Sequence, residues 1–77
     1  MVRAYVLIIA ANNAVKNALD TLRKSKNVES AEAVTGPFDI VVTIKAPDVD
    51  TLGQIVTREI LGIQGIERSL TCFVLNL

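Results

Sequence analysis

The stretch Val34-Thr35-Gly36-Pro37-Phe38-Asp39-Ile40-Val41-Val42-Thr43-Ile44-Lys45 joins a tight turn directly to the most β-prone run of the chain. Glycine readily adopts a positive φ and proline fixes its own φ near about −65°, so Gly36-Pro37 suits a reversal between antiparallel strands. Side chains alternate across a strand. The alternation predicts a central strand over residues 38–45 with two faces: Phe38, Ile40, Val42 and Ile44 on one, and Asp39, Val41, Thr43 and Lys45 on the other.

Before this turn, the pattern predicts a strand, a helix and a second strand. Residues 2–10 are almost continuously apolar, which is typical of a strand covered on both faces. We expect Asn12 and Asn13 to supply N-cap side chains for a helix. The buried stripe of that helix recurs at helical spacing: Val15, Ala18, Leu19 and Leu22. Residues 28–34 contain Glu29 and Glu32 among small apolar residues, which indicates an edge strand protected by charge.

After the central strand, the pattern predicts a helix and a last strand. Pro47 and Asp48 mark the helix start, with Asp48 as the N-cap. Gly62 and Gly65 mark its end, and residues 67–75 alternate as a strand. The helix buries a stripe of four residues: Leu52, Ile55, Val56 and Ile60. The order βαββαβ fits an α+β, ferredoxin-like fold: a four-stranded antiparallel sheet, order 4-1-3-2, with both helices on one face.

Composition indicates a single domain, residues 1–77, that packs against another subunit. Apolar residues make up 51% of the chain, more than one helix-covered face needs. The face without helices is expected to carry much of one apolar set or its alternates: Tyr5, Leu7, Ile9, Val41 and Phe73. We therefore predict dimerisation through the sheet, with Tyr5 and Phe73 as packing residues.

Charge and residue usage exclude several classes of function. Eight basic and eight acidic residues cancel without forming blocks, which argues against direct nucleic-acid or membrane-surface partners. The cluster Arg23, Lys24 and Lys26 is interpreted as a solvated helix end. The lone Cys72 fits a reducing cytoplasm and is interpreted as a small buried hydrophobe. No His and no metal-ligand spacing are present, so no cofactor is expected.

Four motifs together resemble a known domain: the effector-binding domain of Lrp/AsnC transcription regulators, called RAM (regulation of amino acid metabolism). They are Ala4-Tyr5-Val6-Leu7-Ile8, Val34-Thr35-Gly36-Pro37-Phe38-Asp39, Ala46-Pro47-Asp48, and Ile60-Leu61-Gly62-Ile63-Gln64-Gly65-Ile66 leading into Ser69-Leu70-Thr71. Ser69 stands where threonine is commoner. Family regulators also carry a helix-turn-helix, for which this chain has no segment, so we expect a stand-alone form that does not bind DNA.

The resemblance implies a non-enzymatic, cytoplasmic, amino-acid-binding oligomerisation module that modulates transcription regulation of amino acid metabolism through ligand-dependent assembly. Sheet-packed dimers would associate into a ring, an octamer of four dimers, and could also join full-length Lrp/AsnC regulators. A free amino acid would bind near contacts between dimers. The implied ligand-binding residues are Gly36, Phe38, Asp39, Ser69, Leu70 and Thr71.

Several alternatives stay open at this point. Asp39 would pair with a ligand ammonium, or would accept N–H bonds from its own turn. Ser69 and Thr71 would contact a ligand carboxylate, or serve as ordinary strand hydroxyls. A dimeric α+β barrel enzyme, such as a small cofactor-free monooxygenase, shares the topology, although no general acid–base pair stands out. A purely structural interaction domain would differ from an amino-acid sensor only in binding no ligand.

Overall fold

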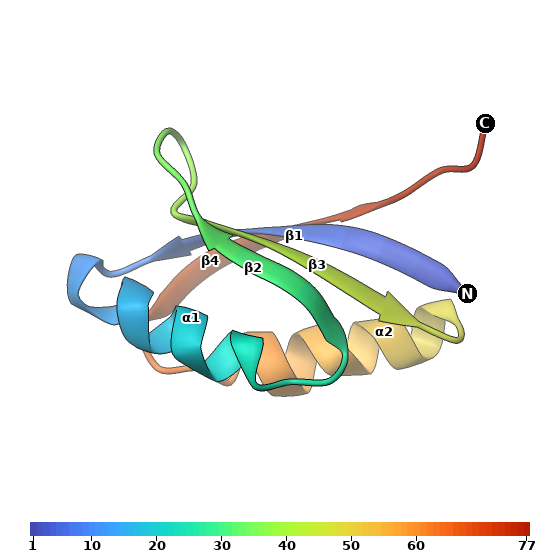
Figure 1. The fold of residues 1–77 in the computed structure, drawn as a ribbon, viewed down its shortest axis with the longest axis horizontal. Helices are drawn as coiled ribbons and strands as arrows, with labels where there is room; N and C mark the ends of the chain where they lie inside the picture. The colour runs from blue at the N-terminus through green and yellow to red at the C-terminus, as the bar shows by residue number, and fades with distance from the viewer.

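The computed structural model describes residues 1–77 and contains four strands and two helical segments in the predicted order (Figure 1). Strands β1 (Val2–Ala10) and β2 (Val28–Ala33) flank the first helical segment, a 3₁₀ turn η1 (Asn12–Ala14) that continues into α1 (Val15–Arg23). Strands β3 (Ile40–Ala46) and β4 (Ile66–Phe73) flank the second, α2 (Val49–Ile55) followed by the π-helical η2 (Val56–Ile60).

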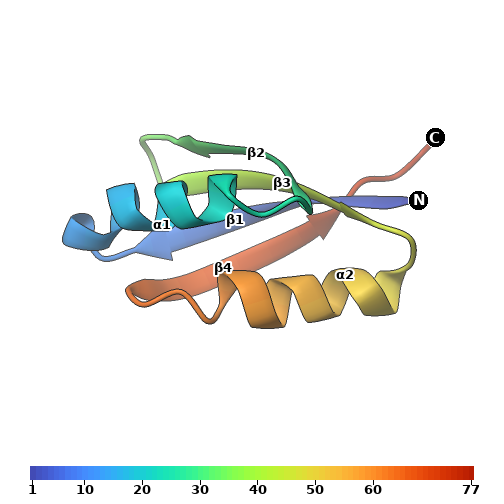
Figure 2. The same cartoon turned by 60° about the horizontal axis from the view of Figure 1, so that its bottom comes forward.

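The four strands form one antiparallel sheet in the order β2-β3-β1-β4. This is the predicted order 4-1-3-2 counted from the opposite edge. Both helices pack on the same face of the sheet (Figure 2). The predicted ferredoxin-like fold is therefore confirmed, and β2 is confirmed as an edge strand.

The core lies between the sheet and the two helices. One face of the two central strands is buried, with Ile8 and Ile44 fully enclosed. The helices cover that face with the apolar stripes predicted for them: Ala18 and Leu22 from α1, and Leu52, Ile55, Val56 and Ile60 from α2 and η2. Val15 and Leu19 pack against this core half-buried. Removal of this apolar surface from water is the main term that holds the helices on the sheet.

The two helices begin in different ways. Asp48 caps α2 as predicted, because its Oδ1 accepts the backbone N–H of Thr51 at 2.7 Å. The predicted caps Asn12 and Asn13 are wrong: both lie in the 3₁₀ turn, and no side chain caps either η1 or α1. The turn bonds through its own backbone, with the Ala14 N–H donating to the Ala11 carbonyl at 2.8 Å. A 3₁₀ turn at a helix start satisfies N–H groups that a cap would otherwise serve.

Gly65 joins the second helical segment to β4 at a place where no larger residue fits. Its φ is +96°, and a Cβ there would come within 2.3 Å of the Ala14 Cβ. The carbonyl of Gly65 accepts the N–H of Ala11 at 2.9 Å, which ties the start of β4 to the end of β1. The predicted end signal at Gly65 therefore has two causes, a positive φ and a close backbone approach.

Candidate functional site

The sheet face opposite the helices carries an uncovered apolar strip. Residues directly across from one another in a sheet share a face. Leu7 lies across from both Val41 and Leu70, and Tyr5 lies across from Cys72. We call this surface the open face, and its apolar members are Tyr5, Leu7, Ile9, Val41, Leu70 and Cys72. Tyr5 is 44% exposed and Leu70 is 52% exposed, so the strip is available to a second surface.

Two sequence interpretations of this region are wrong: that Cys72 is buried, and that Phe73 shares the face of Tyr5. Cys72 is exposed on the open face and is not a buried hydrophobe. Phe73 lies across from Ala4 and so belongs to the helix side, at the end of the sheet. Thr43 faces outward as predicted but is buried, flanked across the strands by Tyr5 and Ser30.

Charged side chains occupy one end of the open face. Glu29 accepts from Arg3 Nε at 3.1 Å and lies 3.8 Å from Lys45 Nζ. Glu29 has no partner in the β2–β3 register, which skips from Val28 to Ser30. The bulge at this residue brings its carboxylate between the two cations. Because all three side chains are partly exposed, this cluster contributes little to stability.

The turn between β2 and β3 is fastened to the end of β1. Within the turn, the Val34 N–H donates to the Asp39 carbonyl at 2.9 Å, and Gly36 adopts a φ of +128°. The Asp39 N–H donates to the Ile8 carbonyl at 2.8 Å. Asp39 Oδ2 accepts the N–H of Ala10 at 2.9 Å. Asp39 therefore accepts a backbone N–H, as one alternative held, but that N–H comes from β1 and not from its own turn.

A small hollow of about 230 Å³ lies beside this turn on the open side of the sheet. We call it the turn hollow, and its lining residues are Ile9, Pro37, Phe38, Arg68, Ser69 and Leu70. Phe38 was expected on the same face as Ile40, but β3 begins only at Ile40, and Phe38 instead shares the hollow with Ile9 and Leu70. Four of the six lining residues, counting Pro37, are apolar, so the wall of the hollow is mostly apolar. The two polar members are Arg68 and Ser69.

The turn hollow contains three of the six predicted ligand-binding residues: Phe38, Ser69 and Leu70. Gly36, at the exposed tip of the turn, does not line it. Asp39 is also outside the lining, with Oδ2 bonded to Ala10. Ser69 and Thr71 lie across from Ile8 and Val6, so alternation places their hydroxyls on the helix side of the sheet, although Ser69 also borders the hollow. This placement favours the role of ordinary strand hydroxyls for both residues.

Sequence reasoning missed three lining residues, Ile9, Pro37 and Arg68. Arg68 lies across from Ile9 in the β1–β4 pair, next to a shift in register after which Ala10 pairs with Ile66. The skipped residue, Glu67, forms a bulge. Alternation alone predicts which residues of one strand share a face, but the register between strands decides which residues meet. A signal for Arg68 was its place inside the motif that leads into Ser69-Leu70-Thr71.

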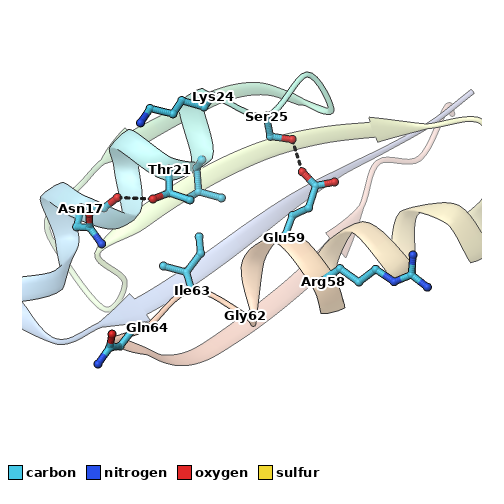
Figure 3. Close-up of a pocket in the computed structure, with 10 residues that line it drawn as sticks. Asn17, Thr21, Lys24, Ser25, Arg58, Glu59, Gly62, Ile63 and Gln64 are labelled. Atoms are coloured by element: carbon cyan, nitrogen blue, oxygen red, sulfur yellow. Dashed lines mark hydrogen bonds between the residues drawn. The ribbon is translucent and has the colours of Figure 1, made fainter.

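The largest cavity, about 480 Å³, lies elsewhere, between α1 and η2 (Figure 3). Its lining is mostly polar, and Lys24 and Arg58 point away from one another rather than into a shared site. Glu59 accepts from the Ser25 hydroxyl and from Asn27 Nδ2, the latter at 2.8 Å. These bonds tie the segment after α1 to η2. The cavity is therefore a polar groove between the two helices.

The basic cluster at the end of α1 is only partly solvent-directed. Lys24 and Lys26 are exposed. Arg23, however, donates from Nε to the Ala31 carbonyl at 3.0 Å and so joins α1 to β2. No group of three acidic or cysteine side chains lies close enough to hold a metal ion. No helix of the structure has the length and apolar character needed to cross a membrane.

Comparisons with known proteins agree with this geometry. A family model described as the Lrp/AsnC ligand binding domain matches residues 3–77. The Thermus thermophilus protein TTHA0845 is 32% identical, with a TM-score of 0.93 over 100% of this chain and 96% of that protein. Escherichia coli AsnC is 25% identical, with a TM-score of 0.91 over 99% of this chain and 52% of AsnC. A search of curated proteins found no significant match.

A third solved structure shares the fold at lower identity. It is the transcriptional regulator NMB0573 of Neisseria meningitidis, solved as a complex with L-Met, 23% identical with a TM-score of 0.87. The alignment covers 97% of this chain and 50% of the regulator, so this chain spans about half of each of the two regulators compared. None of these findings favours the monooxygenase alternative. Since the family model and the 32% identical structure both cover the chain almost completely, the chain belongs to the Lrp/AsnC ligand-binding domain family.

Proposed function

We propose that residues 1–77 form a single effector-binding domain that binds a free amino acid and changes its assembly in response, without catalysing a reaction. The observation that carries this proposal is the position of the turn hollow. It lies at one end of the uncovered open face, beside the turn whose motif resembles the family's ligand-binding element. A ligand in this hollow would meet both this chain and any subunit that covers the open face.

The kind of ligand is supported by the family and by one relative. The family model is described as a ligand binding domain, and the Neisseria meningitidis regulator was solved with L-Met. A free amino acid needs an anionic or carbonyl acceptor for its ammonium and N–H or cationic donors for its carboxylate. Asp39 Oδ1 accepts no hydrogen bond within the chain and is the proposed ammonium partner. Backbone N–H groups near Gly36 are proposed as donors.

The proposed mechanism couples ligand binding to association of subunits. Exposed apolar area on the open face, around Tyr5 and Leu70, favours pairing of two sheets in a dimer. Dimers would associate further into rings such as octamers, or with full-length regulators in the cytoplasm. A ligand shifts such an equilibrium only by its differential affinity for the two assembly states. A hollow at the rim of the interface gives that difference a physical origin, because a neighbouring subunit would complete its wall.

Calorimetric titration of the purified chain with each of the common amino acids tests this function. At least one amino acid should bind with a Kd tighter than about 1 mM. Phe38→Ala, in the hollow, should weaken that binding. Leu61→Ala serves as the control, because Leu61 is 48% exposed on the helical layer and lies outside the hollow. If no amino acid bound with a Kd below about 1 mM, the domain would instead be a structural interaction module.

A further inference from the structure

We infer that the turn hollow selects amino acids with an apolar side chain and that Arg68, in addition to the backbone N–H groups near Gly36, holds their carboxylate. This inference rests on the proposed function, amino-acid binding, and adds the class of ligand and a specific anchoring residue. Arg68 is placed beside the hollow by the register of β4 against β1, and the class of ligand follows from the wall of the hollow.

The wall of the hollow is apolar on the sides contributed by three separate segments. Ile9 comes from β1, Pro37 and Phe38 come from the turn, and Leu70 comes from β4. An acidic or amide side chain placed against this wall would lose water without gaining a hydrogen-bond partner. An aliphatic or thioether side chain would instead remove its own surface and that of Leu70 from water.

The size of the hollow fits a metabolite. Its volume of about 230 Å³ lies below the range of roughly 300–1,000 Å³ that is usual for sites of drug-sized ligands. Asp39, the residue after Phe38, is bonded to β1 through both its N–H and its side chain. These bonds hold the base of the turn beside the hollow, which lowers the ordering cost of binding a ligand there.

The guanidinium of Arg68 has no ion-pair partner within the chain and is free to bind a ligand. Arg3 is paired with Glu29, and Arg23 donates to the Ala31 carbonyl. Arg68 forms neither an ion pair nor a side-chain hydrogen bond in the chain, and it lines the hollow. It lies across from Ile9, which places its side chain on the open side of the sheet. Its planar guanidinium matches the two oxygens of a carboxylate.

The bulge at Glu67 explains how Arg68 reaches this position. Without the extra residue, strict alternation from Ile66, which pairs with Ala10 on the helix side, would return Arg68 to that side. One additional residue shifts the face of every residue that follows. The bulge thus turns the side chains of both Arg68 and Leu70 to the open side of the sheet, where one supplies a positive charge and the other part of the apolar wall.

The inference is tested by calorimetric titration of the chain with leucine, methionine, asparagine, glutamate and leucinol, which lacks the carboxylate. Leucine or methionine should bind at least about tenfold more tightly than asparagine or glutamate. Arg68→Gln should weaken binding of the apolar amino acid about tenfold or more while leaving leucinol unchanged, and Arg68→Lys should recover part of the loss. The matched control Arg58→Gln, on the helical layer, should bind like the parent chain.

The outcomes separate the two proposals. If asparagine or glutamate bound most tightly, or if Arg68→Gln bound the apolar amino acid like the parent chain, the inference would be overturned and amino-acid binding would stand. If no amino acid bound at all, the proposed function would fail and this inference with it. Leu70→Ser, compared with Leu61→Ser at similar exposure, tests the apolar wall without disturbing the core. Equal leucine affinity in these two variants would also overturn the assignment of the wall.

Discussion

The carboxylate of Asp39 accepts a hydrogen bond from the backbone N–H of Ala10 at 2.9 Å, although 29 residues separate them in the chain. The Asp39 N–H donates in return to the carbonyl of Ile8 at 2.8 Å. These two bonds clamp the β2–β3 turn onto the last residues of β1. The bonded residues of β1 are Ile8 and Ala10, and Ile9 lies between them. The two bonds therefore explain why Phe38, the residue before Asp39, lines the same hollow as Ile9.

Asp39→Ala should destabilise the fold by about 1.5–3 kcal/mol, the usual contribution of a hydrogen bond to a charged group. The loss follows because the Ala10 N–H would no longer have its acceptor. Urea unfolding measures this difference, with Asp20→Ala, an exposed acid on α1, as the control. Equal stability of the two variants would show that the hydrogen bond between Asp39 and Ala10 does not stabilise the fold.

Asp39→Asn separates the structural role of this residue from a ligand contact. Asparagine keeps an oxygen acceptor for the Ala10 N–H but removes the negative charge. If Asp39 pairs with a ligand ammonium, this variant should retain most of the stability while binding its amino acid more weakly. The same titration that tests the proposed function gives the answer, and undiminished affinity would limit Asp39 to holding the turn.

Gly65→Ala should cost more stability than Gly36→Ala, although both glycines have a positive φ. At Gly36 a Cβ meets open space, so only backbone strain of about 1–2 kcal/mol is expected. At Gly65 the same strain is joined by a collision with Ala14, and overpacking adds about 1–3 kcal/mol. Thermal melting of both variants checks the order, and an equal loss at the two positions would contradict the close packing at Gly65.

Tyr5→Glu should dissociate the proposed dimer. The new charge would lie in the middle of the open face, where pairing of two sheets would bury it without a partner. Leu61→Glu is a matched control, since Leu61 is 48% exposed and Tyr5 44%, but Leu61 lies on the helical layer. Sedimentation velocity should show a monomer for Tyr5→Glu alone. An unchanged assembly would place the interface elsewhere.

Asp48→Ala should lower the melting temperature at neutral pH by an amount that shrinks in acid. The Thr51 backbone N–H, and secondly the Thr51 side chain, hold the pKa of the Asp48 carboxyl below its usual value of 3.8. A carboxyl whose pKa is depressed by folding stabilises the fold above its unfolded pKa and loses that contribution as pH falls through its folded pKa.

Melting curves from neutral pH to below 3.8 would follow this difference. Asp48→Asn is the control, because asparagine also caps helices but does not titrate. The gap between the parent chain and Asp48→Ala should narrow as the pH falls below 3.8. A gap that stayed constant over that range would show that the ionised carboxylate does not stabilise the start of α2.

The sequence predicted the fold well because its signals are local and agree with one another. The apolar stripe of α2 and η2, the Asp48 cap and the glycine at position 65 each follow from residues within a few positions. The cap at Asn12 failed because a 3₁₀ turn closed the helix start through the backbone instead.

The candidate site was predicted only in part, because it depends on how strands align. Phe38 and Leu70 were found through their motifs and do line the hollow. Arg68 and Ile9 meet only because a bulge at Glu67 shifts the register of β4, which no pattern within one strand reveals. Cys72 was misplaced for a related reason: an apolar neighbourhood in sequence does not say whether the face beyond it is covered.

Sedimentation velocity of the parent chain, with and without the amino acid that binds it, measures whether ligand binding and assembly are coupled. The concentration should be about a hundred times Kd, where a ligand specific for the folded state stabilises it by about 2.7 kcal/mol. Ligand should change the distribution between dimers and larger assemblies, and Tyr5→Glu should abolish this response. Binding that leaves the distribution unchanged would contradict ligand-dependent assembly and leave a ligand-binding domain without it.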